Sequence, residues 1–188
     1  MGGEPLLHLR CADFLRIVRD AFPSSRLSLV TNGLLLARQQ TEFWETCRVT
    51  RTLISVSVYP PVRPQLEALA AHCREEDVSL ECVPSDMFFA RYVPTGNVDV
   101  RKAFRFCRGR GFFCPILREG RIYRCSMGCY AAYWNRAARP GLPAEDGIAL
   151  DSATGPEILD YLMRPMPTCA YCSPAMRMFA WRNGAPKI

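Results

Sequence analysis

Cysteine spacing constrains what this chain can fold into more than any other feature. Four of its ten cysteines fall between residues 107 and 129, and Cys169 and Cys172 follow as a Cys-x-x-Cys pair. Thiolates grouped at such spacings are typical ligands of zinc or of an iron-sulfur cluster. We therefore expect the fold to bring two distant groups of cysteines together around a metal centre.

A β-hairpin is predicted between Cys114 and Cys125. Apolar and polar residues alternate on either side of Glu119 and Gly120, which is typical of a tight turn joining two strands. Such a hairpin carries its cysteines at the base, where the later pair could complete a tetrahedral set of sulfur ligands. The predicted ligands are Cys114, Cys125, Cys169 and Cys172, with Cys107 as a fifth candidate that could replace one of them.

Five arginines lie close in sequence to these cysteines: Arg108, Arg110, Arg118, Arg121 and Arg124. Their positive charge would favour thiolate over thiol and offset the negative charge of a four-thiolate site. Cys129 is left out of the ligand set, because the helix expected to start there would carry it away from the hairpin base. The remaining cysteines are expected to be small buried hydrophobic residues: Cys11, Cys47, Cys73 and Cys82.

Composition narrows the class of protein. Apolar residues make up 49% of the 188 residues, which is enough for a real core. The sequence shows no signal-peptide pattern and no apolar stretch of transmembrane length, so we expect a cytoplasmic protein without a membrane partner. The net charge of +6 is spread along the chain, which is weak evidence for nucleic-acid binding, and we expect none.

The first half of the chain alternates between predicted helices and strands. We expect helices over residues 13–21 and 34–47 and a third carrying Leu66, Leu69 and Cys73; the expected strands cover residues 27–31, 53–59 and 78–83. This alternation indicates βαβ units and a parallel sheet.

The second half follows a different pattern. Regularity stops at residue 85, and residues 94–97 read as a turn or boundary. Beyond the hairpin we expect a helix over residues 127–138 and a last helix that starts with a capping box of Thr154 and Glu157. We predict an α/β domain over residues 1–98 and a small cysteine-rich hairpin-plus-helix domain over residues 99–188.

Three short segments resemble motifs of the radical S-adenosylmethionine (SAM) superfamily. Residues 2–5 read Gly-Gly-Glu-Pro, residues 31–33 read Thr-Asn-Gly, and residues 57–60 read Ser-Val-Tyr-Pro. The resemblance implies a partial TIM-like barrel of parallel strands in which Gly2, Gly3 and Glu4 hold the ammonium of SAM. Asn32 and Ser57 would either contact SAM or serve only as turn and strand-end residues. Because terminal residues not tied into a sheet are usually disordered, we expect Glu4 to be disordered in this chain.

The cysteine spacing resembles the auxiliary-cluster domains called SPASM and twitch. Cys107, Gly120 and Cys125 match the opening of those domains, and Cys169 with Cys172 matches their closing pair. The resemblance implies an auxiliary 4Fe-4S cluster. Zinc favours two closely spaced pairs, whereas here only the second pair is close, so the wider first group suits the cluster better.

One departure limits what the resemblance implies. The superfamily needs a Cys-x-x-x-Cys-x-x-Cys loop to generate its radical, and the nearest copy here, starting at Cys125, has Ala132 in the third place. We interpret the chain as N-terminally truncated, with a naturally cluster-free relative of the superfamily as the alternative, and expect it to be inactive as given. The strand over residues 27–31 would then lack its neighbour, which predicts an exposed apolar edge and low solubility.

The function expected of the intact protein follows from the resemblance. It would take an electron from a flavodoxin or ferredoxin, cleave SAM to a 5′-deoxyadenosyl radical and abstract hydrogen from a substrate, while the auxiliary cluster binds the substrate or accepts an electron. Peptide, sugar and small-metabolite substrates all remain open. The alternative is a non-catalytic, zinc-stabilised module with a structural or partner-binding role.

Overall fold

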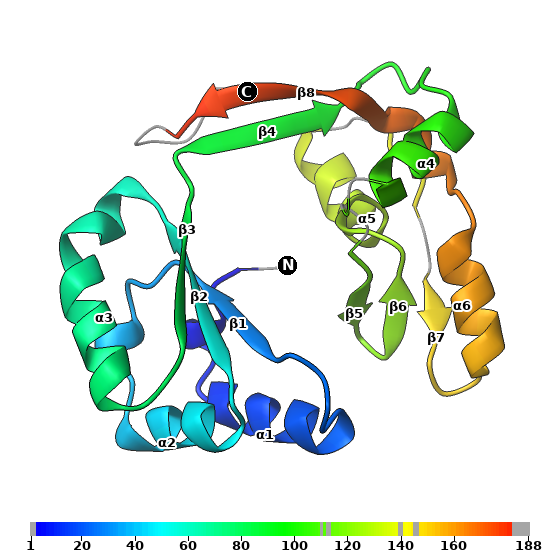
Figure 1. Cartoon of the computed structure of the whole chain (residues 1–188). Helices are drawn as coiled ribbons and strands as arrows, with labels where there is room; N and C mark the ends of the chain where they lie inside the picture. The colour runs from blue at the N-terminus through cyan, green and yellow to red at the C-terminus, as the bar shows by residue number, and fades with distance from the viewer. Residues whose placement is uncertain (1–2, 110, 112–113, 139–140, 145–146, 182–188) are drawn as a thin grey trace. The chain divides into compact units, whose positions relative to one another are not determined.

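The computed structural model describes residues 3–109, 111, 114–138, 141–144 and 147–181. The chain divides into two compact units, the first comprising Gly2–Phe88 with Phe179–Ile188 and the second Phe89–Met178. The predicted domain boundary at residue 98 lies beyond this division. Both units combine helices with strands, so the predicted α/β class is confirmed (Figure 1).

The first unit is built on a parallel sheet of β1 (Ser28–Thr31), β2 (Leu53–Val58) and β3 (Leu80–Pro84), in the order β1-β2-β3. Helix α1 (Cys11–Ala21) precedes β1, and α2 (Thr41–Val49) and α3 (Leu66–Glu75) connect the strands in turn (Figure 1). The predicted βαβ order and parallel pairing are confirmed.

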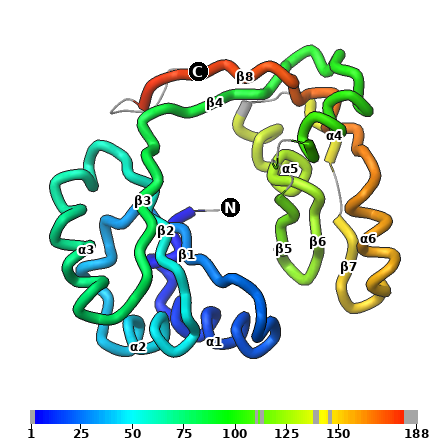
Figure 2. The backbone as a smooth tube through the Cα atoms, in the orientation of Figure 1, coloured from blue at the N-terminus to red at the C-terminus, as the bar shows by residue number. Residues whose placement is uncertain are grey.

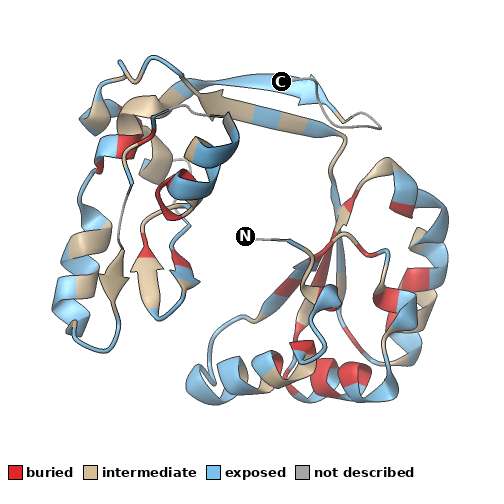
Figure 3. Cartoon of the chain, turned by 180° about the vertical axis from the view of Figure 1, so that it is seen from behind, coloured by how far each residue is buried: buried red, intermediate tan, exposed pale blue. Residues whose placement is uncertain are grey.

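The helices cover one face of this sheet. Ile54 and Val56 of β2 are fully buried, and they belong to the same core as Leu15 of α1, Trp44 of α2 and Leu69 of α3 (Figure 3). Burying each large side chain contributes about 1.5–3 kcal/mol, so this layer supplies much of the unit's stability.

The opposite face of the sheet is more polar. Val30, Ser55 and Glu81 lie side by side in register across the three strands, and the Ser55 hydroxyl donates to Glu81 Oε2 at 3.1 Å. Val30 is 46% exposed. In the described part of the chain β1 pairs with β2 alone and is an edge strand, of which Val30 is the exposed apolar residue. The low solubility predicted from this edge stays a prediction.

The prediction of one helix over residues 34–47 is wrong in its first half. The Leu34 amide donates to Asn32 Oδ1 at 2.9 Å, which makes a turn. A short 3-10 helix, Leu36–Arg38, then carries Leu36 into the core, and α2 starts only at Thr41. A continuous helix would not let the chain turn at this point and still bury Leu36.

The non-ligand cysteines follow the prediction with one exception. Cys11, Cys47 and Cys73 are buried, whereas Cys82 of β3 is exposed, so the prediction for Cys82 is wrong. Burial raises the pKa of Cys47 to about 12 and that of Cys73 to about 11, which keeps both as neutral thiols.

A two-stranded ribbon that the sequence pattern does not indicate is formed by β4 (Met87–Tyr92) and β8 (Cys172–Ala180). Segments some eighty residues apart thus lie side by side (Figure 2). In the first unit, Phe88 stacks between Tyr59 and Phe179, with ring centroids 5.8 and 5.7 Å away.

The second unit contains the predicted hairpin. Its strands are β5 (Ile116–Arg118) and β6 (Arg121–Tyr123), and β7 (Ile148–Ala149) adds to β6. Glu119 and Gly120 have φ of +50° and +69°, as a two-residue turn of the predicted type requires.

Four helical segments surround this hairpin. They are α4 (Val100–Gly109), α5 (Ser126–Ala138), α6 (Gly155–Met163) and the 3-10 helix η4 (Pro167–Tyr171). The predicted capping box is confirmed, because Glu157 Oε2 accepts from the Thr154 amide at 2.8 Å. Among the described helices, none is both long and apolar enough to cross a membrane.

Candidate functional sites

The Glu4 carboxylate is held at the carboxyl end of β1. Its Oε1 accepts from the Thr31 hydroxyl at 2.6 Å and from the Leu6 amide at 3.1 Å, and its Oε2 accepts from the Asn32 amide at 2.8 Å. The expectation that Glu4 would be disordered is therefore wrong. Three hydrogen bonds tie it to the sheet.

Thr31 is a support for Glu4 that the motif itself does not indicate. Its side chain is 2% exposed, and its hydroxyl accepts from the Gly33 amide at 3.1 Å while it donates to Glu4. Gly33 has φ of +80°, and a Cβ there would lie 2.9 Å from a methyl carbon of Val56. Only glycine allows the chain to turn this closely over β2.

The surroundings of Glu4 fit an ammonium group. A carboxylate offers about four acceptor positions, and three are taken by the donors above. Gly3 has φ of +102° and open space where a side chain would stand. Gly2, the other predicted glycine, lies outside the described residues.

Asn32 and Ser57 lie near the carboxyl ends of neighbouring parallel strands, since Thr31 pairs with Val56. Asn32 uses its side-chain oxygen in the turn to Leu34, so it supports Glu4 through its backbone amide. Ser57 is half-buried on the same face of β2 as Ser55. The structure thus brings Glu4 and the strand ends that carry Asn32 and Ser57 to the carboxyl end of the sheet.

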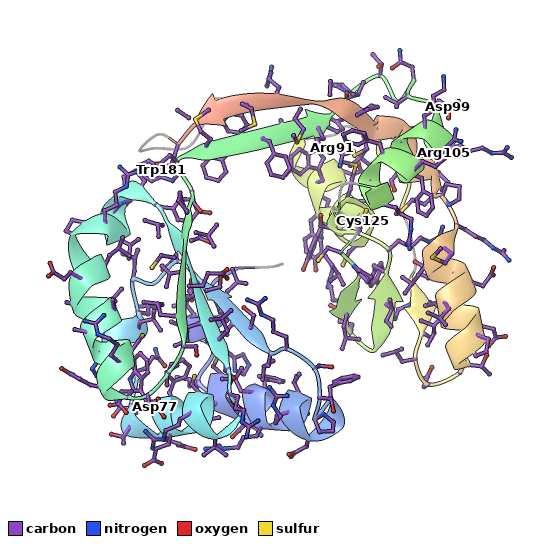
Figure 4. The ribbon with its side chains drawn as sticks, in the orientation of Figure 1. Asp77, Arg91, Asp99, Arg105, Cys125 and Trp181 are labelled. Carbon is purple, nitrogen blue, oxygen red and sulfur yellow. The ribbon has the colours of Figure 1, made fainter. Side chains whose placement is uncertain are left out.

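In the second unit, four predicted cysteines come from separate elements. Cys107 lies in α4, Cys125 joins β6 to α5, and Cys169 and Cys172 lie in and just after η4. Helix α4 packs against η4, and the Val98 amide before α4 donates to the Ala170 carbonyl at 3.0 Å. Cys125 is labelled in Figure 4.

Electrostatic coupling links the closing pair, Cys169 and Cys172, to two other predicted ligands. Burial raises the pKa of Cys172, and the nearby Cys107 and Cys125 raise it further. Burial likewise raises the pKa of Cys169, with Cys172 and Cys107 adding to the effect. Since coupling between charges falls with distance, Cys107 lies within electrostatic range of both closing cysteines, and Cys125 within range of Cys172.

Cys114 behaves differently from this group. It is exposed, and it is not among the groups that shift the pKa of Cys169 or Cys172. The arrangement favours Cys107 over Cys114 as the fourth member of a ligand set. Within the described ranges, no three Cys, His, Asp or Glu side chains already converge as a metal site.

Two arginines act on the thiols. Arg124 lowers the pKa of Cys169, and its Nη1 donates to the Arg164 and Pro165 carbonyls at 3.0 Å each. Arg91, which is labelled on β4 in Figure 4, lowers the pKa of Cys172. Its Nε donates to the Ser173 carbonyl at 2.9 Å. Both are thus fixed beside the cysteines, as a negatively charged centre would require.

The other predicted arginines that the structure describes make contacts with groups besides the cysteines. Arg118 pairs with Glu119 and Arg121 donates to the Gly147 carbonyl. Arg108 lies over the ring of Phe104, and Arg110 is outside the described residues. Arg91 was not predicted, since nothing local in sequence connects it to a cysteine.

Cys129 is a core residue of the second unit. It is 6% exposed and packs with Ile116 and Tyr123. Its thiol is therefore used for packing, in agreement with its omission from the predicted ligands.

The chain was compared with protein-family models and with curated proteins, and it matches none of them.

Proposed function

We propose that this chain is part of a radical SAM enzyme. It would hold the amino-acid end of SAM at the Glu4 edge of the parallel sheet and an auxiliary 4Fe-4S cluster on Cys107, Cys125, Cys169 and Cys172. The observation that carries the proposal is the Glu4 carboxylate, fixed by Thr31 and Asn32 at the carboxyl ends of parallel strands. Ligands of α/β sheets bind at this edge.

The sheet would form part of a barrel. Its helix-covered face is the apolar one, and the face with Ser55, Ser57 and Glu81 would line the interior. The free edge of β1 would continue to further strands. A polar interior of this kind would bind a charged cosubstrate.

The chain's own residues would orient SAM. Glu4 would accept a hydrogen bond from its ammonium, while Thr31 and the Asn32 amide keep the carboxylate from turning away. Gly3 would leave the backbone open to close approach. Bound SAM supplies the means of abstracting hydrogen from a substrate. No Cys-x-x-x-Cys-x-x-Cys motif occurs in the 188 residues, so we assign radical generation to no residue of this chain.

The cysteine group fits a four-thiolate centre. Its donors are all sulfur, they are partly shielded from water, and Arg91 and Arg124 stand beside them. A cluster bound here would supply a substrate ligand or an electron acceptor. The proposed enzyme would take electrons from a reductant such as flavodoxin or ferredoxin. Its substrate would be a peptide, a sugar or a small metabolite.

Titration with SAM tests the Glu4 site. The NMR resonances of the Asn32 and Gly33 backbone amides should shift as SAM is added. Glu4→Gln should weaken SAM binding about 10- to 100-fold, because it removes a charged hydrogen bond. Glu45→Gln on α2 is the matched control and should bind normally. Equal binding by Glu4→Gln and the parent chain would exclude this site.

The second candidate is a zinc-stabilised, non-catalytic module. An all-cysteine donor set such as Cys107, Cys125, Cys169 and Cys172 also suits structural zinc, which is four-coordinate and needs no cosubstrate. One zinc per chain, without iron and without SAM binding, would favour this function.

A further inference from the structure

The second unit contains a cavity of about 260 Å³, and half of the residues that line it are aromatic. It is lined by Tyr92, Ser126, Met127, Tyr130, Trp134 and Leu142. A cavity of ~150 Å³ lined by apolar side chains is enough to hold benzene. The volume therefore suits one substituted aromatic ring.

One face of α5 forms most of the wall. Ser126, Tyr130 and Trp134 recur every four residues, so they project from the same side of the helix. Leu142 closes the cavity, and its amide and carbonyl are both bonded to the Asn135 side chain at 2.8 Å. The wall is thus held in shape from within the unit.

The ring of Tyr92 is a further part of the wall. It meets Trp134 edge-on with centroids 5.9 Å apart and stacks on Tyr171 at 6.5 Å, with 8° between the planes. Trp134 is 50% exposed although it lines the cavity, which leaves ring surface available to a ligand. Rings arranged edge-on and stacked favour a further ring over a saturated group.

The cavity is connected to the cysteines at two points along the chain. Ser126 directly follows Cys125, and Tyr171, which supports Tyr92, lies between Cys169 and Cys172. We infer that the cavity binds an aromatic ring and, resting on the proposed function, that the ring is an aromatic side chain of the substrate. Tyrosine-like, tryptophan-like or phenylalanine-like groups all have this chemistry.

The test uses 4-methylphenol and its saturated counterpart 4-methylcyclohexanol, which have the same substituents and similar size. Binding is followed on the full chain by the indole N–H resonance of Trp134, which is assigned by its loss in Trp134→Phe. We expect a saturable shift with 4-methylphenol and several-fold to about tenfold weaker binding of the saturated compound.

Two variants connect binding to the cavity. Trp134→Ala should abolish 4-methylphenol binding, measured by saturation transfer to the ligand. Tyr133→Phe should leave it unchanged, because Tyr133 does not line the cavity and phenylalanine keeps the ring that packs against Tyr130, with centroids 6.3 Å apart. Equal affinity for both compounds, or no shift at Trp134, would overturn the inference.

The iron content of the same samples separates this inference from the proposed function. If the chain contains iron but does not bind 4-methylphenol, the inference of a ring site is wrong and the proposed enzyme function is unaffected. If the chain binds 4-methylphenol and SAM but contains zinc, the ring site is supported and the auxiliary iron-sulfur cluster is excluded.

Discussion

The Thr31 hydroxyl donates to Glu4 Oε1 at 2.6 Å while it accepts from the Gly33 amide at 3.1 Å. One buried hydroxyl therefore connects the segment before α1 to the end of β1 and to the turn that follows. The proposed SAM site depends on this connection, because it holds the carboxylate at the sheet edge.

Replacing Thr31 by Val should destabilise the first unit. The variant keeps the shape of the side chain but leaves Glu4 without its shortest hydrogen bond, and such a loss costs about 1–3 kcal/mol. Urea denaturation should show this decrease in the free energy of unfolding. Thr31→Ser, which keeps the hydroxyl, should be clearly more stable than Thr31→Val; equal stability of the two would contradict the role of the hydroxyl.

Gly96 should not tolerate a side chain. It has φ of +60°, and a Cβ would lie 2.6 Å from the ring carbon Cζ of Tyr171. Gly96→Ala combines backbone strain with a clash. It should therefore lower the free energy of unfolding by about 1–3 kcal/mol more than strain alone and displace the Tyr171 ring from Tyr92.

Gly120→Ala is the matched control for this substitution. Gly120 has a similar φ of +69°, but nothing lies within 4 Å of the added Cβ. The difference between the two variants in thermal unfolding measures the clash with Tyr171. Variants of equal stability would show that the ring is not fixed against Gly96.

Local chemistry predicted the elements that depend on neighbouring residues. The hairpin turn at Glu119 and Gly120 and the capping box of Thr154 and Glu157 need only short segments, and both are confirmed. The alternation of the first half likewise predicted the order of the parallel sheet, since crossover helices leave little choice of pairing.

Long-range pairing was beyond the sequence pattern. Strand β4 finds its partner β8 some eighty residues later, and this pairing places Arg91 near Cys172. Cys107 lies on α4, a helix that the sequence pattern does not indicate, and it approaches the closing cysteine pair through the packing of α4 on η4. Thr31 was overlooked as a support because a threonine at a strand end is ordinary.

Alkaline pH should destabilise the first unit through Cys47. Burial raises its pKa from 9.0 to about 12, so the folded chain keeps a proton that the unfolded chain releases. The stabilisation is complete below the unfolded value and is lost as pH rises from 9.0 towards about 12.

Comparison with Cys47→Ala checks this pH dependence. The variant should be less stable at neutral pH, because it leaves a cavity, but its free energy of unfolding should fall less steeply above pH 9.0. Parallel curves for the two chains would contradict a buried, neutral thiol at this position.

Arg124 should support whatever metal the cysteines hold. Arg124→Gln removes the charge that lowers the pKa of Cys169, so thiolate formation and metal retention should both decrease. Competition with a chelator measures retention. Arg136→Gln, on α5 and over the ring of Tyr133, is the control and should retain metal as the parent chain does.

Metal and sulfide analysis of the chain purified without oxygen tests the central claim most directly. We predict about four irons with matching sulfide, lost in Cys107→Ala and kept in Cys114→Ala, because Cys107 and not Cys114 is coupled to the closing pair. One zinc without iron, or loss of iron in Cys114→Ala alone, would contradict the account.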